Sequence, residues 1–430
     1  MLPVFVLATF LNSPLHLYKN SIFADTAHLF GRFFYVLWSD MRILAIETSC
    51  DETAISVVEA TGDFPKASYT ILGDALHSQV DLHQAYGGVF PTMAKREHTK
   101  RIVPLVTQAL KEAGIAEAGA TTLTTETNTA LADILVREPN LYEEVQKFFS
   151  AYQKPDIDLI AVTTGPGLEP ALWVGINFAK ALATAWQLPL APIDHMEGHI
   201  LASLYDVVED DQLATVQFPA LALLISGGHT ELVLMSNWGH YEKIGQTVDD
   251  AVGEAFDKVA RMLGLPYPGG PAISKLAQAA RQQELPPYKN DLPRPMLKSN
   301  DLNFSFSGLK TAVLYSIGEA TLSDTDKMAL ARDFEDAVTE VLVQKTSRAA
   351  ATHNCQTVIV GGGVSANSHI KQSLQLHFLT EHPNCELYFP KPGLSTDNAI
   401  MIALAGHAHH ADASNAAAAR FFTADGNKSL

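Results

Sequence analysis

The chain has 430 residues, 47% hydrophobic and 18% charged, which is enough for a large core and favours two or more domains. Its formal net charge of -17 excludes nucleic-acid binding through a generally basic surface, so such a role needs a local basic patch or a basic partner. The three cysteines, Cys50, Cys355 and Cys385, have no paired spacing, which excludes a disulfide framework and favours a reducing compartment.

Residues 1–40 contain one apolar stretch, "PVFVLATFL". It is too short to span a bilayer. It also lacks the preceding Lys or Arg that a signal peptide has. We interpret residues 1–40 as an N-terminal extension or an upstream start, with Met41 opening the first domain. A membrane or targeting segment is the alternative.

The first half of the chain predicts alternating strands and helices. "RILAIETS" and "TAISVVE" indicate a strand, a tight turn and a second strand. The following elements are a helix at 97–114, a pattern break at 117–154, a strand at 158–167, a helix at 171–188 and a strand at 189–194. Within 117–154, "GATTLTTETNT" is Thr-rich and loop-like, and "ALADILVREPNLYEEVQKFFSAY" indicates broken helix. We interpret the segment as an insertion at a surface connection.

The second half repeats the opening pattern. "PALALLISGGHTELVLMS" (219–236) again indicates strand, turn and strand. Helices at 248–263 and 327–352, a strand and glycine loop at 357–370, and a closing strand, loop and helix at 386–408 follow. Two such units predict a duplicated two-lobe α/β protein with a central cleft. The expected division is an N-terminal lobe (41–194), a C-terminal lobe (195–395), a closing helix returning to the first lobe (396–410) and a tail (411–430).

Three glycine loops follow strand or helix ends: "ISGGHT", "YPGGP" and "GGGVSAN". Glycine lets a backbone approach a ligand closely and turn its N–H groups onto phosphate oxygens. A single loop of this kind is usually only a turn, but three in one chain favour contact with a phosphate-bearing ligand.

"DHMEGH" places His195 and His199 four residues apart, on one face of a helix, where both can reach one ion. Zinc proteases need the glutamate directly after the first histidine, but Met196 stands there and Glu197 points elsewhere. A protease is therefore disfavoured. Two histidines alone make an incomplete metal site, which needs a third ligand from elsewhere. On the residues alone, the pair therefore indicates either part of a metal site or two histidines on the polar face of a helix.

Two segments offer that ligand. Asp397 lies in "STDNA", just before a helix. "DDAVGEAFDK" places Asp250, Glu254 and Asp257 at helical spacing, where a solvated acidic face is the alternative.

The only dense basic run is "AKREHTKR" (94–101). Its cations could contact phosphate or form an ordinary solvated face. The candidate phosphate-contacting residues of this run include Lys95, Arg96, Lys100 and Arg101.

Together the motifs resemble the tRNA adenosine threonylcarbamoyltransferase family, whose bacterial member is called TsaD. Ten occur in the family's order: "ETSCDET", "YGGVFP" with "REH", "GPGL", "HMEGH", "SGGHT", "GEAFDK", "YPGGP", "FSFSGLKT", "GGGVSAN" and "STDNA". The resemblance covers about Met41 to Ala408 outside the insertion. We expect no family counterpart for residues 1–40 and 117–154, and Glu169-Pro170 stands where common bacterial members have small or apolar residues.

The resemblance implies an actin-like, sugar-kinase-like and Hsp70-like ATPase fold. It implies transfer of a threonylcarbamoyl group from threonylcarbamoyl-AMP to N6 of adenosine 37, in tRNAs reading codons that begin with A, to form t6A. One divalent metal ion, iron or zinc with Fe2+ preferred, is implied at His195, His199 and Asp397. The implied substrate-binding positions are Leu224, Ile225, Ser226, Gly227, Gly228, Asp257, Gly270 and Asn367.

The implied partners are tRNA, an inactive paralogue (TsaB) and a P-loop ATPase (TsaE). The resemblance also implies a cytoplasmic location and no membrane partner. No catalytic general base is identified. A small-molecule kinase of this fold would need a catalytic aspartate and no His-x-x-x-His pair, and a non-catalytic scaffold should lack the metal ligands and "GGGVSAN". A metalloprotease is opposed by Met196.

Overall fold

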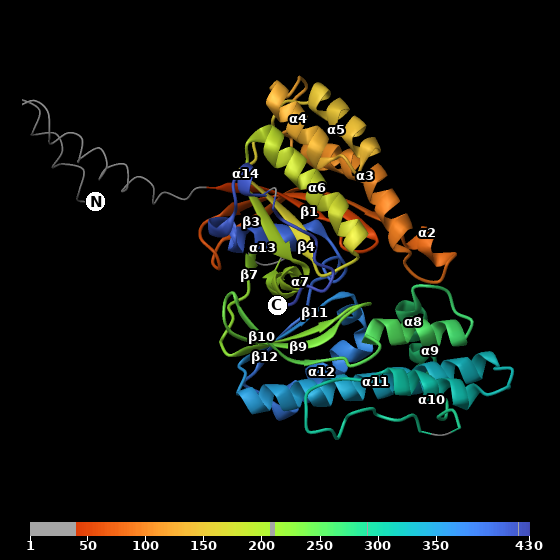
Figure 1. Cartoon of the computed structure of the whole chain (residues 1–430). Coiled ribbons are helices and arrows are strands. Elements are labelled where there is room, and N and C mark those ends of the chain that lie inside the picture. Colours follow the sequence, from red (N-terminus) through yellow and green to blue (C-terminus); the bar gives the residue numbers. More distant parts are fainter. Residues whose placement is uncertain (1–39, 207–210, 290, 420) are drawn as a thin grey trace, which may run out of the picture. The chain divides into compact units, whose positions relative to one another are not determined.

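A computed structural model describes residues 40–206, 211–289, 291–419 and 421–430 (Figure 1). Met41–Leu430 form one compact unit. The expectation of an extension or targeting segment falls on residues that, except for Asp40, lie outside the described part. No helix within that part is long and apolar enough to cross a membrane.

A seven-stranded sheet organises the N-terminal half, in the order β5-β4-β1-β2-β3-β7-β6. Its strands are β1 (Met41–Glu47), β2 (Glu52–Thr61), β3 (Ser68–Ser78), β4 (Leu159–Gly165), β5 (Leu190–Asp194), β6 (Tyr205–Asp206) and β7 (Gln212–Leu213). The expected β1–β2 hairpin is antiparallel, and β4 lies parallel to β1 on its other side. The long strand β3 was not predicted from the sequence.

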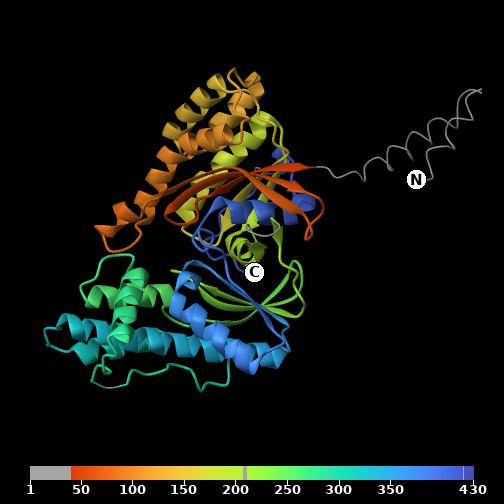
Figure 2. The ribbon, with the colours of Figure 1, turned by 180° about the vertical axis from the view of Figure 1, so that it is seen from behind.

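Helices cover both faces of this sheet (Figures 1 and 2). Leu44 and Ile46 of β1 join one apolar cluster, and Ile43 and Ala45 join another, as the alternation of side chains along a strand requires. One face packs on α3 (Pro91–Glu112) and α6 (Glu169–Trp186), and the opposite face on α13 (Ala399–Ala408). The short helices α2 (Val80–Gln84) and α14 (Ala416–Ala419) complete this half.

The Thr-rich stretch after residue 117 is not all loop. It contains α4 (Thr125–Ile134), capped by the Thr124 hydroxyl accepting from the Thr127 N–H, and leads to α5 (Pro139–Ala151). Leu141, Val145, Phe148 and Phe149 are buried on one face of α5, at helical spacing. The expectation of a loop was therefore wrong from Thr125 onward, whereas α4 and α5 confirm the broken helix expected for the second part of the segment.

A five-stranded sheet organises the C-terminal half, in the order β10-β9-β8-β11-β12. Its strands are β8 (Ala220–Ile225), β9 (Thr230–Asn237), β10 (His240–Gln246), β11 (Thr357–Gly361) and β12 (Glu386–Tyr388). Its helices are α8 (Val252–Met262), α9 (Gly269–Gln282), α10 (Ser307–Ile317), α11 (Asp324–His353) and α12 (Ser368–Glu381), with short 3-10 turns at Gly363–Ala366 and His410–Asp412.

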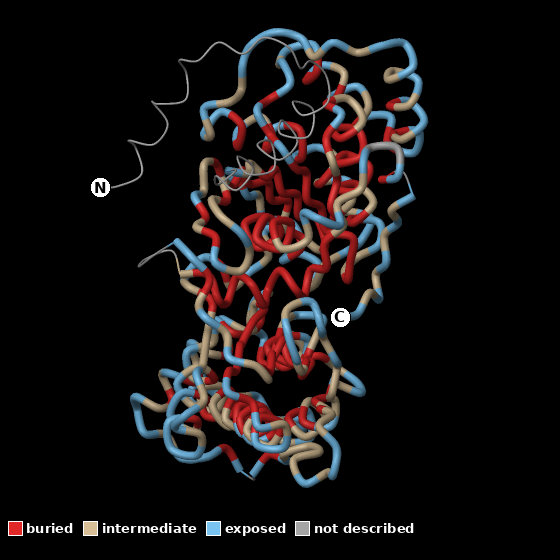
Figure 3. Tube along the Cα trace, turned by 90° about the vertical axis from the view of Figure 1, so that its left-hand side faces the viewer, coloured by how far each residue is buried: buried red, intermediate tan, exposed pale blue. Residues whose placement is uncertain are grey.

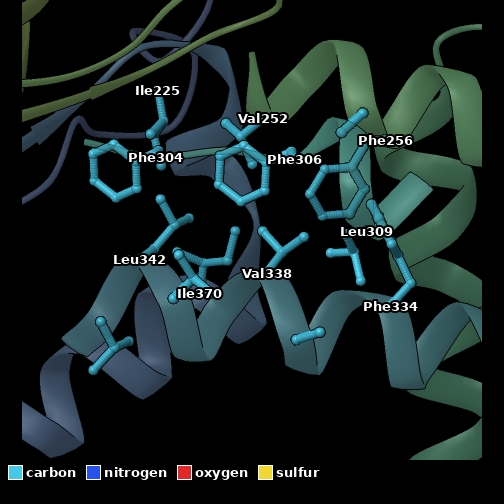
Figure 4. Close-up of a cluster of buried hydrophobic side chains, with 14 of the residues drawn as sticks. Ile225, Val252, Phe256, Phe304, Phe306, Leu309, Phe334, Val338, Leu342 and Ile370 are labelled. Carbon is cyan, nitrogen blue, oxygen red and sulfur yellow. The ribbon is translucent and has the colours of Figure 1, made fainter. Parts of the chain in front are cut away.

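One apolar cluster joins this second sheet to its helices (Figure 4). Phe304 and Phe306, from the segment "LNFSFSG", stack with ring centroids 6.3 Å apart, and Phe256 meets Phe334 edge-on at 5.1 Å. Burial of such large side chains accounts for the long helix α11 lying along the sheet.

Helix α7 (His195–Leu204) lies where the two sheets meet. It contacts β4 and β5 of the first sheet, β8 and β11 of the second, and α13. All ten of its residues are buried, and Figure 3 shows this buried central region between the two sheets. Residues at its two ends are therefore held by both halves of the unit.

Candidate metal centre and surrounding loops

The histidine helix begins immediately after a strand. Asp194 ends β5 and caps α7, because its Oδ1 accepts the N–H groups of Met196 (2.8 Å) and Glu197 (3.4 Å). This cap starts the helix at His195, so that His195 and His199 lie one turn apart on the same face.

Asp397 meets both histidines from a different segment. Its Oδ1 is 3.4 Å from His195 Nε2 and 3.2 Å from His199 Nε2. One potential ligand atom of each of the three residues lies within 4.8 Å of the others. Asp397 is positioned by the start of α13, where the Asn398 side chain caps the helix by accepting the Met401 N–H (3.0 Å). Of the carboxylates considered, the structure thus brings Asp397, not those at 250–257, to the histidines.

The charges in this group are strongly coupled. Burial would raise the pKa of Asp397, but the attraction and hydrogen bonds of the two histidines prevail and hold it far below its usual range. Burial would lower the pKa of His195, but Asp397 and Glu47 raise it well above its usual value. Both ring nitrogens of His199 are buried: Nδ1 has no hydrogen-bond partner among the described residues, and Nε2 faces Asp397 Oδ1. A site with an unsatisfied imidazole beside a carboxylate fits a divalent cation.

Further acidic groups lie near this centre and were not assigned from the sequence. Burial, with Asp397 and Asp51 nearby, raises the pKa of Glu52 to about 9. Glu47 lies 3.1 Å from His195 Nδ1. The signal was present in "ETSCDET", because Glu47 ends the buried strand β1 and Glu52 begins β2.

Glu197 points away from the centre, as predicted. Its two oxygens accept hydrogen bonds from the Tyr241 hydroxyl (2.7 Å) and pair with His409 Nε2 (2.7 Å). Glu197 is thus engaged with β10 and with the end of α13, and it does not lie where a metalloprotease needs its general base.

The loop after β8 contains the predicted Ser226, Gly227 and Gly228. The Ser226 hydroxyl accepts the N–H of Gly228 (3.3 Å) and of His229 (3.1 Å) and so shapes the turn. A Cβ added at Gly227 or Gly228 would meet nothing within 4 Å. Leu224 and Ile225, in contrast, are fully buried in β8, so any ligand contact they make is through the backbone.

The three glycine loops come from neighbouring elements. A Cβ at Gly253, at the start of α8, would lie 2.6 Å from the Ser226 carbonyl oxygen, and one at Gly362 would lie 2.5 Å from that of Ile225. A Cβ at Gly361 would lie 3.0 Å from the His199 carbonyl oxygen. The loops after β8 and β11 are therefore packed on each other and on the histidine helix.

Asp257 and Gly270 belong to a second pair of neighbours. Asp257 Oδ1 accepts the Gly269 N–H (2.6 Å), which joins α8 to the loop "YPGGP". Burial raises the pKa of Asp257 despite this hydrogen bond. Gly270 is open, because a Cβ there would meet nothing within 4 Å.

Asn367 is joined to α9 rather than directly to the metal centre. Its amide nitrogen donates to Ser274 Oγ and Glu335 Oε1 (both 2.8 Å), and its oxygen caps α12. The loop "GGGVSAN" is thus joined to α11 and to α9, the helix that begins within "YPGGP".

The basic run is largely paired. Lys95 pairs with Glu138 (2.7 Å), and Lys100 and Arg101 both pair with Glu97. No ion pair is described for Arg96, which is exposed. The local excess of positive charge is therefore smaller than the sequence indicates.

The family model described as "TsaD: tRNA N6-adenosine threonylcarbamoyltransferase" matches residues 70–122 and 140–404. A protein of that name from Polynucleobacter necessarius is 42% identical over 376 residues, covering 85% of this chain and 91% of its own. The one from Bacillus subtilis is 41% identical over 369 residues, covering 85% and 90%. Full-length HypF, a solved structure, has a TM-score of 0.46 at 12% identity, covering 86% of this chain and 46% of its own.

Proposed function

Because the chain belongs to the tRNA N6-adenosine threonylcarbamoyltransferase family, we propose that it transfers a threonylcarbamoyl group from threonylcarbamoyl-AMP to N6 of adenosine 37 in tRNAs reading ANN codons. The product is t6A. The observation that carries the proposal is the group of His195, His199 and Asp397, whose two histidines are buried in α7, a helix that contacts β8, the strand before the open glycine loop.

Those three residues would hold one divalent ion, with Fe2+ the preferred candidate and zinc the other. The buried His199 imidazole, whose Nε2 faces Asp397 and whose Nδ1 has no hydrogen-bond partner among the described residues, supports this assignment. The ion, when bound, supplies Lewis-acid polarisation of substrate oxygens. Asp397 and the capped helix α7 would keep the ligand atoms together before substrate arrives.

The adenylate would lie along the glycine loops. Leu224, Ile225, Ser226, Gly227 and Gly228 would offer backbone groups to its phosphate, since the open Gly227 and Gly228 let an anion approach closely. Asp257, Gly270 and Asn367 would contact the nucleoside and threonyl parts, as positions that match the family's motifs.

The transfer itself needs an unstacked acceptor base. The N6 amine attacks the carbamoyl carbon, the bond from that carbon to the phosphate oxygen breaks, and AMP leaves as an anion while N6 loses a proton. We assign no residue as the general base. Lys95, Arg96, Lys100 and Arg101 are proposed to face the tRNA, with exposed Arg96 the strongest candidate.

The wider setting follows from the family. We propose a two-lobe, actin-like arrangement with lobes at 41–194 and 195–395, a closing helix at 396–410 and a tail at 411–430. Contacts of α13 with β1, β2 and β4 support the return of that helix to the first lobe. We also propose action in the cytoplasm, with partners resembling TsaB and TsaE.

A reconstituted modification assay tests the function. The full chain would receive unmodified tRNA, ATP, threonine, bicarbonate, an adenylate synthase and the two partner proteins, and nucleosides would be quantified by mass spectrometry. We expect t6A from the parent and at least a 100-fold loss in His195→Ala. His240→Ala, at the exposed first residue of β10, is the matched control and should retain activity. Absence of t6A with the folded parent would refute the transferase assignment.

A further inference from the structure

A second carboxylate lies behind His195, on the side of the ring away from Asp397. Glu47, the last residue of β1, is fully buried. Its Oε2 is 3.1 Å from His195 Nδ1, whereas Asp397 Oδ1 is 3.4 Å from His195 Nε2. The two ring nitrogens therefore face different carboxylates.

The orientation of Glu47 is fixed by other donors. Its Oε1 accepts the backbone N–H of Ser49, and its Oε2 accepts the Thr163 hydroxyl from β4 at 2.5 Å. A carboxylate can only accept, so the remaining contact of Oε2 requires a proton on His195 Nδ1. Nε2 is then the nitrogen left to bind a cation.

We infer that Glu47 is a positioning residue for the metal centre: it holds the proton of His195 on Nδ1 and thereby makes Nε2 the ligand atom. Metal-binding histidines commonly donate their other ring N–H to such a carboxylate, and loss of that partner costs about 10–100-fold in metal affinity. This inference rests on the proposed function only in taking the histidine group as a cation site.

The neighbouring groups do not supply the same control. The Ser49 hydroxyl is 3.2 Å from His195 Nδ1, but a hydroxyl can donate or accept and so permits either proton position. His199 Nδ1 has no hydrogen-bond partner among the described residues. Glu47 therefore acts on one of the two histidines.

Glu47→Gln in the full chain is the test. In this variant the backbone N–H of Ser49 requires the amide oxygen as its acceptor, so the amide NH2 group must face Thr163 and His195 Nδ1. Because the NH2 group is a donor, it cannot accept a hydrogen bond from a proton on Nδ1 and disfavours that proton position. We expect Zn2+ affinity, measured by competition with a chromophoric chelator, to fall about 10–100-fold. Thr163→Val is the matched control. It removes a hydrogen bond to the same oxygen without opposing Nδ1–H, and its Zn2+ affinity should stay within about threefold of the parent.

A direct measurement does not depend on either variant folding. In the Zn2+-bound parent labelled with 15N-histidine, long-range 1H–15N spectra should show His195 protonated at Nδ1, with its signals identified by their loss in His195→Ala. An Nε2–H signal, or unchanged Zn2+ affinity in folded Glu47→Gln, would overturn the inference. These readouts need no tRNA, so the inference can fail while t6A is formed, and it can hold while t6A is not.

Discussion

At the scale of single residues, the same side chain has different chemistry depending on its surroundings. His98 stands in the densest basic run of the sequence, yet it is fully buried. Its Nε2 donates to the Cys50 carbonyl oxygen (3.0 Å), and its Nδ1 accepts from the Thr53 hydroxyl (2.8 Å). Burial lowers the pKa of His98 to about 4, so this residue is neutral and does not add to the charge of the basic run.

This burial predicts acid sensitivity. The folded pKa of about 4 lies below the ordinary His value, so the unfolded state binds a proton first as pH falls. The contribution of His98 to the free energy of unfolding is fully present above about pH 6.5. It decreases as the pH falls toward 4, by up to about 3 kcal/mol.

Urea unfolding from pH 7 to 4 measures the effect. His98→Gln cannot gain this proton, so its free energy of unfolding should fall less steeply than that of the parent. Exposed His240→Gln is the control. Parallel slopes for the parent and His98→Gln would contradict this account.

At the scale of elements, the site depends on how closely α8 approaches the loop after β8. The Gly253 N–H donates to the Ser226 carbonyl oxygen at 3.2 Å, and the Val252 N–H donates to the Thr230 hydroxyl at 2.8 Å. The start of this helix is thus attached to both ends of the turn that contains Gly227 and Gly228. A side chain at Gly253 would push the two elements apart, whereas one at Gly228 would point into open space.

Two alanine substitutions separate packing from binding. Gly253→Ala places a Cβ 2.6 Å from a backbone oxygen, and we expect it to lower the free energy of unfolding by about 1–3 kcal/mol. Gly228→Ala should change stability by less than about 0.5 kcal/mol but weaken adenylate binding. Chemical denaturation and calorimetry with a non-hydrolysable adenylate would measure both. Equal stability of the two variants would refute the proposed close packing.

At the scale of the whole unit, the metal group is assembled from two distant segments. His195 and His199 start a helix that contacts both sheets, and Asp397 arrives nearly 200 residues later before α13, which packs on α7. The two histidines are buried with this helix, while Asp397 is partly exposed, so the group is shielded from solvent mainly on the side of α7. The site is therefore a property of the packed unit rather than of one motif.

The sequence predicted much of this arrangement, and its failures have physical reasons. Strong periodicity located β1, β8, α6 and α11, and helical spacing paired His195 with His199. Strand β3 was missed because "SYTILGDALHS" mixes buried and exposed positions irregularly around a bulge opposite Val57 and Val58. The role of Glu47 was missed because it depends on a contact with His195, 148 residues away.

The central claim is that the group of His195, His199 and Asp397 holds an ion required for transfer. The most direct test adds Fe2+ stepwise to chelator-treated full chain and measures both bound iron and the initial rate of t6A formation. The account predicts that the rate rises with occupancy and saturates at one ion per chain, and that Asp397→Ala neither binds the ion tightly nor gains activity. A full rate in the stripped, metal-free parent would contradict it.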